Sequence, residues 1–492
     1  MRIVDLGVIL VYLAGITWFG ARFRKSQTTL KDYFLGGRNA PWWAIGFSIV
    51  SAETSILTVI STPGMTVLKN GNFGFLQLVM GYLLARIIIS TLFLPAYFKG
   101  ELFTAYELMT RRFGTRIRKL TAGLFLILRA LAEGVRVWAM STVISIVLGT
   151  GEELSIILIV CLTLFYTFEG GMTAVIWTDV IQMFLYIAGA ILSLFVILNQ
   201  IPGGWTHVVE LGQQYNKFQV FDFRFGMERW FFETPFTFWA GFIGGCFLTT
   251  ASHGTEQLMV QRLLSAKSES DARKALFSSW FVILFQFTLF LIIGVCLFAY
   301  HGAPVITLAK QADRMYPEFV WNHLPQGIAG LIIAAILAAA MSNLSAALNA
   351  LASTTVMDFW KPLSRVARPD SEYLRLARYV TLVWGVVLFA VALLARGWGS
   401  VLQAGLSIAS ILYGGLLGVF LLGLLTKRTG EVAAMCGMTA GLVLMLYIKF
   451  ATNIAWTWYV LIGTTVTFLT AYLLSFAIQE NPHANTDPST HH

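Results

Sequence analysis

The chain has 492 residues, of which 57% are hydrophobic and 12% are charged, and its mean hydropathy is +0.72. A soluble domain carries about 25% charged residues, so this composition excludes a soluble globular protein. The formal charge of +9 comes from basic residues in short loops between apolar runs, where such residues orient a chain in a bilayer. The charge therefore argues against a nucleic-acid-binding surface, and we expect no nucleic-acid partner.

Apolar runs recur along the chain, most of them about 20 residues long, which is the length that crosses a hydrocarbon core of about 30 Å as a helix. The sequence therefore predicts an all-α polytopic membrane protein, with the lipid bilayer as its surroundings. We predict thirteen spans, at residues 4–22, 41–68, 73–96, 117–149, 153–169, 172–200, 236–262, 270–300, 326–355, 376–396, 399–425, 430–450 and 455–477.

Basic residues gather in alternate loops, and this pattern predicts the orientation. Loops rich in Lys and Arg face the cytoplasm. With thirteen spans, this places the N-terminus outside and the C-terminus in the cytoplasm, in the inner (plasma) membrane of the cell. The residues that mark the four basic loops are Arg22, Arg24, Lys25, Lys31 and Arg38; Lys99, Arg111, Arg112 and Arg116; Arg262, Lys267, Arg273 and Lys274; and Lys361, Arg365, Arg368 and Arg375.

Two predicted spans are interrupted by polar residues. Span 41–68 carries SAETS, which includes Glu53, at its middle, and span 236–262 carries a glycine pair followed by a polar run at 249–256. A single Ser or Thr in such a helix usually bonds to its own backbone or to a neighbouring helix, but this explanation does not account for Glu53. Unwound backbone is tolerated in a membrane only where it lines a cavity or is covered by protein, so both breaks are expected at a central cavity.

The interrupted spans occupy corresponding positions if each one opens a unit of five helices. Such a pair is the sequence pattern of an inverted-repeat secondary transporter. The predicted organisation is a leading span and cytoplasmic loop at 1–40, a first repeat at 41–200, an extracellular loop at 201–235, a second repeat at 236–425, and trailing helices with a cytoplasmic tail at 426–492. The two longer outside loops, 201–235 and 301–325, are expected to form short helices or gates.

Span 326–355 carries a candidate cation site. Ala339, Ser342 and Asn343 stand at i, i+3 and i+4, on one face of a helix. A hard cation such as sodium takes several oxygen ligands, and free carbonyls at Ser51 and Thr54 in the first break would complete the set. The alternative is a helix interface built from small residues.

Asp179 lies early in span 172–200, and an acidic residue within a membrane is a functional candidate by default. It has the chemistry to hold a second cation together with Ser342 and Ser345. The alternative places it near the cytoplasmic end of the span, where it caps a helix or pairs with a basic residue.

Four stretches of the sequence carry a family likeness. They are GGMTAVIWTDVIQ (170–182), GTEQLMVQRLLSAKS (254–268), GIAGLIIAAILAAAMSNLSAALN (327–349) and GVFLLGLLTKRTGEVAAMCG (418–437). In these stretches the chain resembles the sodium:solute symporter family. The resemblance implies a leucine-transporter-like fold with two inverted five-helix repeats, and a sodium gradient that drives solute uptake. It also implies a shared sodium site at Ser51, Thr54, Ala339, Ser342 and Asn343.

The chain departs from the family pattern at both cation sites. The family usually has Ser or Thr where this chain has Asn343, which changes the expected ligand from a hydroxyl to an amide oxygen. Members with a second sodium use an aspartate that matches Asp179 together with several serines, one of which is replaced here by Ala346. We therefore expect one sodium ion for each transport cycle.

The resemblance places Glu53 where sugar-carrying members have an amide that binds the sugar. Three roles are open for Glu53: it accepts hydrogen bonds from a hydroxylated solute, it pairs with a cationic solute, or it forms an internal salt bridge with Arg86 or Arg136. Without a partner, its burial would raise its affinity for protons and make it a proton carrier.

Further residues are candidates to line the solute cavity. Arg136 either pairs with Glu133 at i−3 or, as in sialic acid members, meets a solute carboxylate. A lone polar residue on an apolar helix is commonly a hydrogen-bonded packing residue, and this alternative applies to the others. The substrate-binding candidates are Glu53, Gln77, Tyr82, Arg136, Ser252 and His253.

These observations predict a transporter and not an enzyme, because the spans contain no nucleophile and base motif and no metal-ligand spacing. The predicted activity is sodium-driven uptake, by alternating access, of a small polar solute such as a sugar or a carboxylate, by a chain that functions as a monomer. The alternatives are a proton-coupled symporter and a membrane sensor that binds solute without transport.

Overall fold

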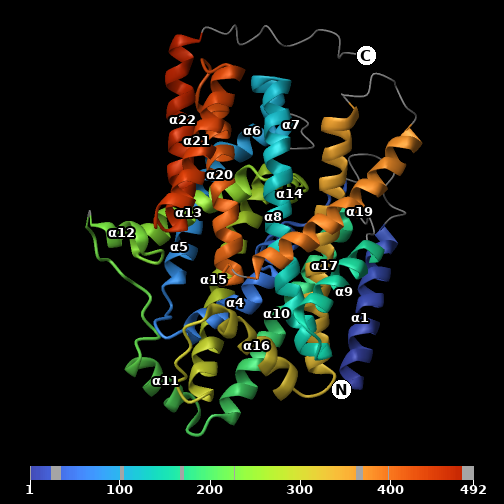
Figure 1. Cartoon of the computed structure of the whole chain (residues 1–492), viewed down its shortest axis with the longest axis vertical. Helices are drawn as coiled ribbons and strands as arrows, with labels where there is room; N and C mark the ends of the chain where they lie inside the picture. The colour runs from blue at the N-terminus through green and yellow to red at the C-terminus, as the bar shows by residue number, and fades with distance from the viewer. Residues whose placement is uncertain are drawn as a thin grey trace.

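The computed structural model describes residues 2–23, 35–99, 105–166, 171–226, 228–361, 370–396 and 398–478. The regular structure of these residues is helical (Figure 1). The all-α architecture predicted from the apolar runs is therefore confirmed.

The predicted spans appear as helices at the expected positions. Ten helices are long and apolar enough to cross a membrane, and α3 with α4, bent by 63°, makes an eleventh. Predicted span 153–169 appears as α9, which has 15 described residues. Predicted span 236–262 appears as α13, which has 17 residues, followed by α14. The helices are α1 (Ile3–Arg22), α3 (Trp42–Glu53), α4 (Ile56–Val67), α5 (Phe75–Ile88), α6 (Leu94–Phe98), α8 (Thr115–Leu148), α9 (Glu152–Tyr166), α10 (Gly171–Gln200), α13 (Phe238–Gly254), α14 (Gln257–Leu264), α15 (Glu269–Tyr300), α17 (Ile328–Thr354), α19 (Asp370–Ala395), α20 (Val401–Leu425), α21 (Glu431–Ala451) and α22 (Tyr459–Ala477).

Both interrupted spans are broken where the sequence predicted. The first break falls between α3 and α4, at Thr54 and Ser55, and the second falls between α13 and α14, at Thr255 and Glu256. Thr54 leaves the helical region of backbone space with φ −82° and ψ 75°. The polar run of each span therefore sits at the point where the helix stops and restarts.

The longer loops contain short helices, as predicted. Loop 201–235 holds α11 (Gly204–Gln214) and α12 (Arg229–Glu233), and loop 301–325 holds α16 (Ala309–His323). A further short helix, α7 (Ala105–Phe113), precedes α8. α16 packs against α4, the second half of the first interrupted span.

The helices pack closely around the two breaks. α15 contacts both α3 and α4, α10 packs on α3, and α13 packs on α5. α20, α21 and α22 contact one another and lie side by side at one edge of the molecule (Figure 1). α1 packs against α17 on the other side, where Asp5 accepts hydrogen bonds from the backbone N–H groups of Gly327 and Gly330.

Glycines allow the close contact between α5 and α13. A Cβ atom placed at Gly81 would lie 2.1 Å from Phe242 O, and one at Gly245 would lie 2.1 Å from Leu78 O. Small residues at such positions let two backbones approach closely in a membrane. The glycine pair noted in span 236–262 therefore serves helix packing.

We expect the substitution Gly81→Ala to lower the stability of the protein by about 1–3 kcal/mol, because the added methyl overpacks a contact with backbone. The measurement is the thermal unfolding of the purified protein in detergent. The matched control is Gly15→Ala in α1, where an added Cβ meets nothing within 4 Å. A Gly81→Ala protein as stable as the control would contradict the close contact.

Candidate functional site

The first break leaves backbone carbonyls without their usual helical partners. The N–H of Ser55 donates to Glu53 O at 3.0 Å, and the N–H of Thr58 donates to Ser55 O at 2.9 Å. In a continuous helix these two groups would donate to the carbonyls of Ser51 and Thr54. These two oxygens are the ones that the sequence predicted as cation ligands.

The side chain of Thr54 fixes the break to a neighbouring helix. Its hydroxyl donates to Gln286 Oε1 on α15 at 2.9 Å, and Thr54 is 3% exposed. The hydroxyl uses only its hydrogen in this bond and keeps its lone pairs, so Thr54 can offer its carbonyl or its hydroxyl oxygen to a cation.

The other half of the predicted sodium site lies on α17. Ala339 is buried, and Ser342 and Asn343 are half-buried. α17 packs against α4 and α10. α17 therefore meets the second half of the interrupted span, which begins two residues after Thr54.

Asp179 on α10 forms a salt bridge with Arg262. Its Oδ2 atom lies 3.0 Å from Arg262 Nη2 and accepts a hydrogen bond from Ser48 Oγ at 2.6 Å. Arg262 Nε donates to the same Ser48 hydroxyl at 2.9 Å. The cluster joins α3, α10 and α14, and this is the alternative in which Asp179 pairs with a basic residue. Ser345, the other candidate for the second cation, is buried on α17.

Glu53 forms an internal salt bridge. Its Oε2 atom lies 3.3 Å from Arg86 Nη2 and 3.3 Å from His253 Nε2. Arg86 is buried and also donates from Nε to Leu276 O at 2.9 Å. Of the partners that the sequence suggested, the structure has Arg86 and not Arg136.

Arg136 belongs to a second charged cluster. It pairs with Glu133 one turn earlier on α8, as the i, i+3 spacing suggested. Arg129 Nη2 lies 3.0 Å from the same Glu133 carboxylate, and Arg129 Nη1 lies 3.2 Å from Glu256 Oε1. The hydroxyl of Tyr413 on α20 donates to Glu256.

Sequence reasoning did not include Arg129, Glu256 or Tyr413 among the site residues. Two signals were present, because Arg129 stands at i−4 from Glu133 and Glu256 lies within the second break. Tyr413 has no such signal, since it sits on an otherwise regular helix and reaches the cluster only through the fold.

Both clusters line one cavity of about 180 Å³, which we call the central cavity. Five of the six substrate-binding candidates are among its lining residues. Apolar side chains of α8, α13 and α20 complete the wall. The polar and aromatic lining residues are Glu53, Ser55, Thr58, Tyr82, Tyr106, Thr121, Phe125, Arg129, Arg136, Thr249, Ser252, His253, Glu256 and Tyr413.

Gln77 is the candidate that the structure places elsewhere. Its amide nitrogen donates to Phe236 O at 2.7 Å, and its amide oxygen accepts from the N–H of Asp222 at 3.0 Å. Both groups hold the loop before α13 against α5. The sequence did not reveal this role, because the partners of Gln77 lie about 150 residues away in the chain.

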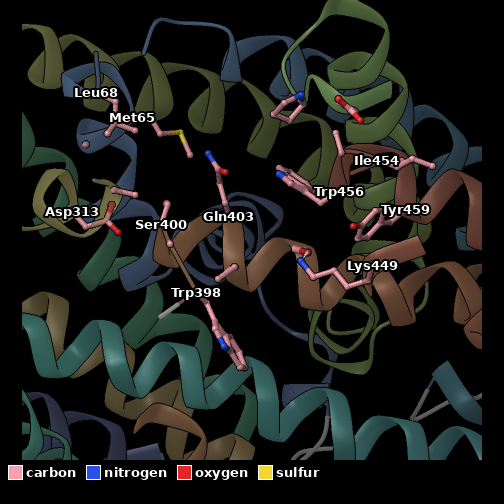
Figure 2. Close-up of a pocket in the computed structure, with 18 residues that line it drawn as sticks. Met65, Leu68, Asp313, Trp398, Ser400, Gln403, Lys449, Ile454, Trp456 and Tyr459 are labelled. Atoms are coloured by element: carbon pink, nitrogen blue, oxygen red, sulfur yellow. Dashed lines mark hydrogen bonds between the residues drawn. The ribbon is translucent and has the colours of Figure 1, made fainter. Parts of the chain in front are cut away.

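A second cavity of about 470 Å³ opens beside α16, and we call it the loop-side cavity. Figure 2 shows Gln403 and Lys449 among its lining residues, with Asp313 and Ser400 at one end and Trp456 and Tyr459 at the other. α20 separates the two cavities along its first turns. Leu402, Gly405 and Leu406 line the central cavity, whereas Gln403, Ala404 and Ser407 line the loop-side cavity.

The start of α20 is fastened to two other helices. Asp313 Oδ2 on α16 accepts from the N–H of Val401 at 3.1 Å, and Ser61 Oγ on α4 accepts from the N–H of Leu402 at 3.3 Å. Ser61 also hydrogen-bonds Asp313, and burial raises the pKa of the Asp313 carboxyl from 3.8 to about 6. We call this arrangement the α20 latch.

We expect the α20 latch to be stronger at low pH. Because the pKa of the Asp313 carboxyl is raised in the folded protein, this group stabilises the folded state at a pH below 3.8. The stabilisation is lost as the pH rises through about 6. The wild type should lose up to about 3 kcal/mol of stability between pH 4 and pH 6.5, a loss that Asp313→Asn removes. The measurement is thermal unfolding against pH.

The control for this prediction is Asp222→Asn. A hydrogen bond from Arg224 lowers the pKa of Asp222, so its contribution to stability is lost as the pH falls and has the opposite sign. An Asp313→Asn protein with the same pH profile as wild type would contradict the titration of the α20 latch.

Comparison with known proteins agrees with the geometry. The family model described as "Sodium:solute symporter family" matches residues 33–441. The sodium/sialic acid symporter NanT of Aliivibrio fischeri is 28% identical over 479 residues, which cover 96% of this chain and 93% of that protein.

Two solved structures bear on the fold. The substrate-bound, outward-open structure of a Na⁺-coupled sialic acid symporter has a TM-score of 0.79 at 26% identity, covering 96% of this chain and 98% of that one. Mhp1, a nucleobase-cation-symport-1 family transporter, has a TM-score of 0.57 at 13% identity, covering 90% and 93%, and this likeness concerns the fold alone. The predicted leucine-transporter-like fold is confirmed. Because the family model spans most of the sequence, the chain belongs to the sodium:solute symporter family and is a multi-pass membrane transporter that couples sodium to a small solute.

Proposed function

We propose that the protein takes up one small polar organic solute together with one sodium ion, and that the ion binds between the first break and α17. The observation that carries this proposal is the break itself, which frees the carbonyls of Ser51 and Thr54 next to the central cavity. Ala339 O, Ser342 Oγ and the Asn343 amide oxygen supply the remaining ligands. Five oxygens are a suitable set for a hard cation.

We propose one sodium ion because the carboxylate of the second candidate site is already paired with an arginine side chain. Asp179 is paired with the guanidinium of Arg262, which supplies the positive charge that a second ion would bring. Ala346 also removes one hydroxyl from that site. Asp179 and Arg262 then act in holding α3, α10 and α14 together.

The proposed position of the sodium ion explains how sodium binding is coupled to solute binding. The ion would join α4 and α17 at the edge of the cavity whose wall includes Glu53 and Ser55 on either side of the same break. Each ligand can then raise the affinity of the other by the same factor, typically worth about 1–3 kcal/mol. Solute and ion therefore favour the same arrangement of the helices.

The two cavities support alternating access. The proposed orientation in the plasma membrane has the N-terminus outside and the C-terminus in the cytoplasm. In this orientation the loop-side cavity faces outward, and the end of the central cavity near Tyr106 and Thr121 faces inward. The repeats 41–200 and 236–425 would rock against each other, and the α20 latch would close the outer path. Since both cavities lie within one chain, we propose that the monomer is the functional unit.

Proton coupling is the second candidate, and the ion pairs count against it. A proton carrier has to gain and lose its charge during the cycle. Glu53 and Asp179, the two acids considered for this role, each have an arginine partner that stabilises the charged form. Both acids are therefore proposed as fixed charges.

The test is uptake by proteoliposomes that contain the purified protein. An inward sodium gradient should drive solute accumulation, whereas a proton gradient imposed in sodium-free buffer should not. Accumulation driven by protons alone would overturn the sodium proposal in favour of the alternative. Solute binding with no accumulation under either gradient would point to a sensor.

A further inference from the structure

The charges around the central cavity are fully paired. Among the residues that the structure describes, Glu53, Glu256, Arg129 and Arg136 line the cavity, and Arg86 and Glu133 lie behind them. These are three carboxylates and three guanidinium groups. Each carboxylate lies within salt-bridge distance of at least one arginine, and each arginine lies within that distance of a carboxylate. These six carboxylate and guanidinium groups together have no net charge.

A charged solute has no free counter-charge in such a cavity. A carboxylate that entered would have to recruit Arg136 from Glu133 or Arg129 from Glu256. In the first case the carboxylate of Glu133, which has no exposed surface, would keep only Arg129, and in the second case Glu256 would lose its arginine. Weakening a buried ion pair in this way is destabilising. An ammonium group would meet the same obstacle at Glu53, whose partner Arg86 is also unexposed.

One hydrogen-bonding atom is available instead. Arg136 lines the cavity, and its Nε atom is buried and has no hydrogen-bond partner within the described part of the chain. His253 also lines the cavity, but its Nε2 atom lies 3.3 Å from Glu53 Oε2 and its Nδ1 atom lies 2.8 Å from Ser252 Oγ. A hydroxyl group both donates and accepts a hydrogen bond, so it can accept from Arg136 Nε without breaking an ion pair.

The remaining wall of the cavity suits the carbon skeleton of a hydroxylated ring. Leu57, Leu248, Met259, Leu402 and Leu406 supply apolar surface, and Tyr82 and Tyr413 supply aromatic rings. The volume of about 180 Å³ limits the occupant to a small solute, and a hexose is the size class that we consider.

We infer that the transported solute is a neutral, polyhydroxylated molecule of about the size of a hexose, and not a carboxylate. This inference rests on the proposed function, because it takes the central cavity as the solute site. It separates the chain from its sialic acid relatives, because sialic acid carries a carboxylate.

The first test compares matched solutes that differ only in charge. Sodium-dependent stabilisation and sodium-driven uptake are measured at pH 8, above the usual titration range of histidine, for glucose against glucuronate and galactose against galacturonate. Inositol, N-acetylneuraminate, lactate and alanine complete the panel. A neutral hexose or inositol should bind at least 10-fold more tightly than any charged or zwitterionic member. A carboxylate or amino acid as the best solute would overturn the inference, and so would a panel in which no member binds with or without sodium.

The second test asks whether removing a carboxylate near the cavity shifts the preference from hexoses to uronates. Glu133→Gln should release Arg136 from its carboxylate partner and raise the ratio of uronate affinity to hexose affinity at least 10-fold. Glu53→Gln, which frees Arg86, is the second variant if the first does not fold. Glu152→Gln is the matched control, because Glu152 pairs with Lys310 and Arg396 away from the cavity. An unchanged ratio of uronate to hexose affinity in both cavity variants would contradict the charge argument.

The two proposals fail in different ways. Sodium-driven uptake of a carboxylate alone would leave the sodium symport proposal standing and remove the inference about the solute. Binding of a hexose without sodium dependence would do the reverse. The panel therefore distinguishes an error about the solute from an error about the coupling ion.

Discussion

Replacing Ser342 by Ala is expected to raise the sodium concentration for half-maximal uptake by about 10- to 100-fold. The hydroxyl is a proposed ion ligand on α17, and a hydrogen bond or comparable contact to a charged group contributes about 1.5–3 kcal/mol, where about 1.4 kcal/mol is tenfold in affinity. The maximal uptake rate at saturating sodium should change much less. The measurement is the initial rate of solute uptake by proteoliposomes against external sodium.

Ser345→Ala is the matched control for this prediction. Ser345 stands on the same helix and belongs only to the candidate second site. If no ion binds there, the substitution should change the half-saturating sodium concentration by less than about threefold. Two results would contradict the proposed sites. One is an unchanged sodium dependence of Ser342→Ala, and the other is an equal loss in both variants, which would indicate a second ion.

The second large effect is expected at the pair between Asp179 and Arg262. Arg262→Met leaves the Asp179 carboxylate buried with only Ser48 as a partner, and breaking a buried pair costs about 3–5 kcal/mol. The double substitution Asp179→Asn with Arg262→Met removes the orphaned charge and should recover most of the lost stability. The measurement is a double-mutant cycle of unfolding free energies in detergent.

Arg273→Met is the control for the loss of an arginine. Arg273 pairs with Glu269 at the surface and its side chain is 45% exposed, so its removal should cost no more than about 1 kcal/mol. If the double variant at Asp179 and Arg262 were as unstable as the sum of the two single variants, the two residues would not act as a pair. The one-sodium proposal would then lose its structural support.

The two tests are linked through stoichiometry. If Arg262 takes the place of a second ion, the uptake rate should depend on sodium with a Hill coefficient near one in the wild type. This expectation concerns Asp179 alone and does not depend on which atoms bind the ion between α4 and α17. It can therefore be checked with any solute that the protein accumulates.

Much of the fold could be predicted from local patterns in the sequence. The apolar runs placed the helices, because a helix that crosses a bilayer must present apolar side chains on its lipid-facing surface. The polar runs around Glu53 and at 249–256 predicted where α3 and α13 end, because unwound backbone requires nearby polar groups. The spacing of Glu133 and Arg136 predicted their pairing, since i and i+3 share a helix face.

Only the tertiary structure decided which distant side chains meet. Glu53 pairs with Arg86, and Asp179 pairs with Arg262, which stands 83 residues away. Gln77 turned out to hold a loop. A local pattern shows that a buried charge needs a partner, but the choice of partner depends on how separate helices pack. The sequence by itself therefore determined the helices and their breaks, and the packing of those helices determined that the charges around the central cavity cancel.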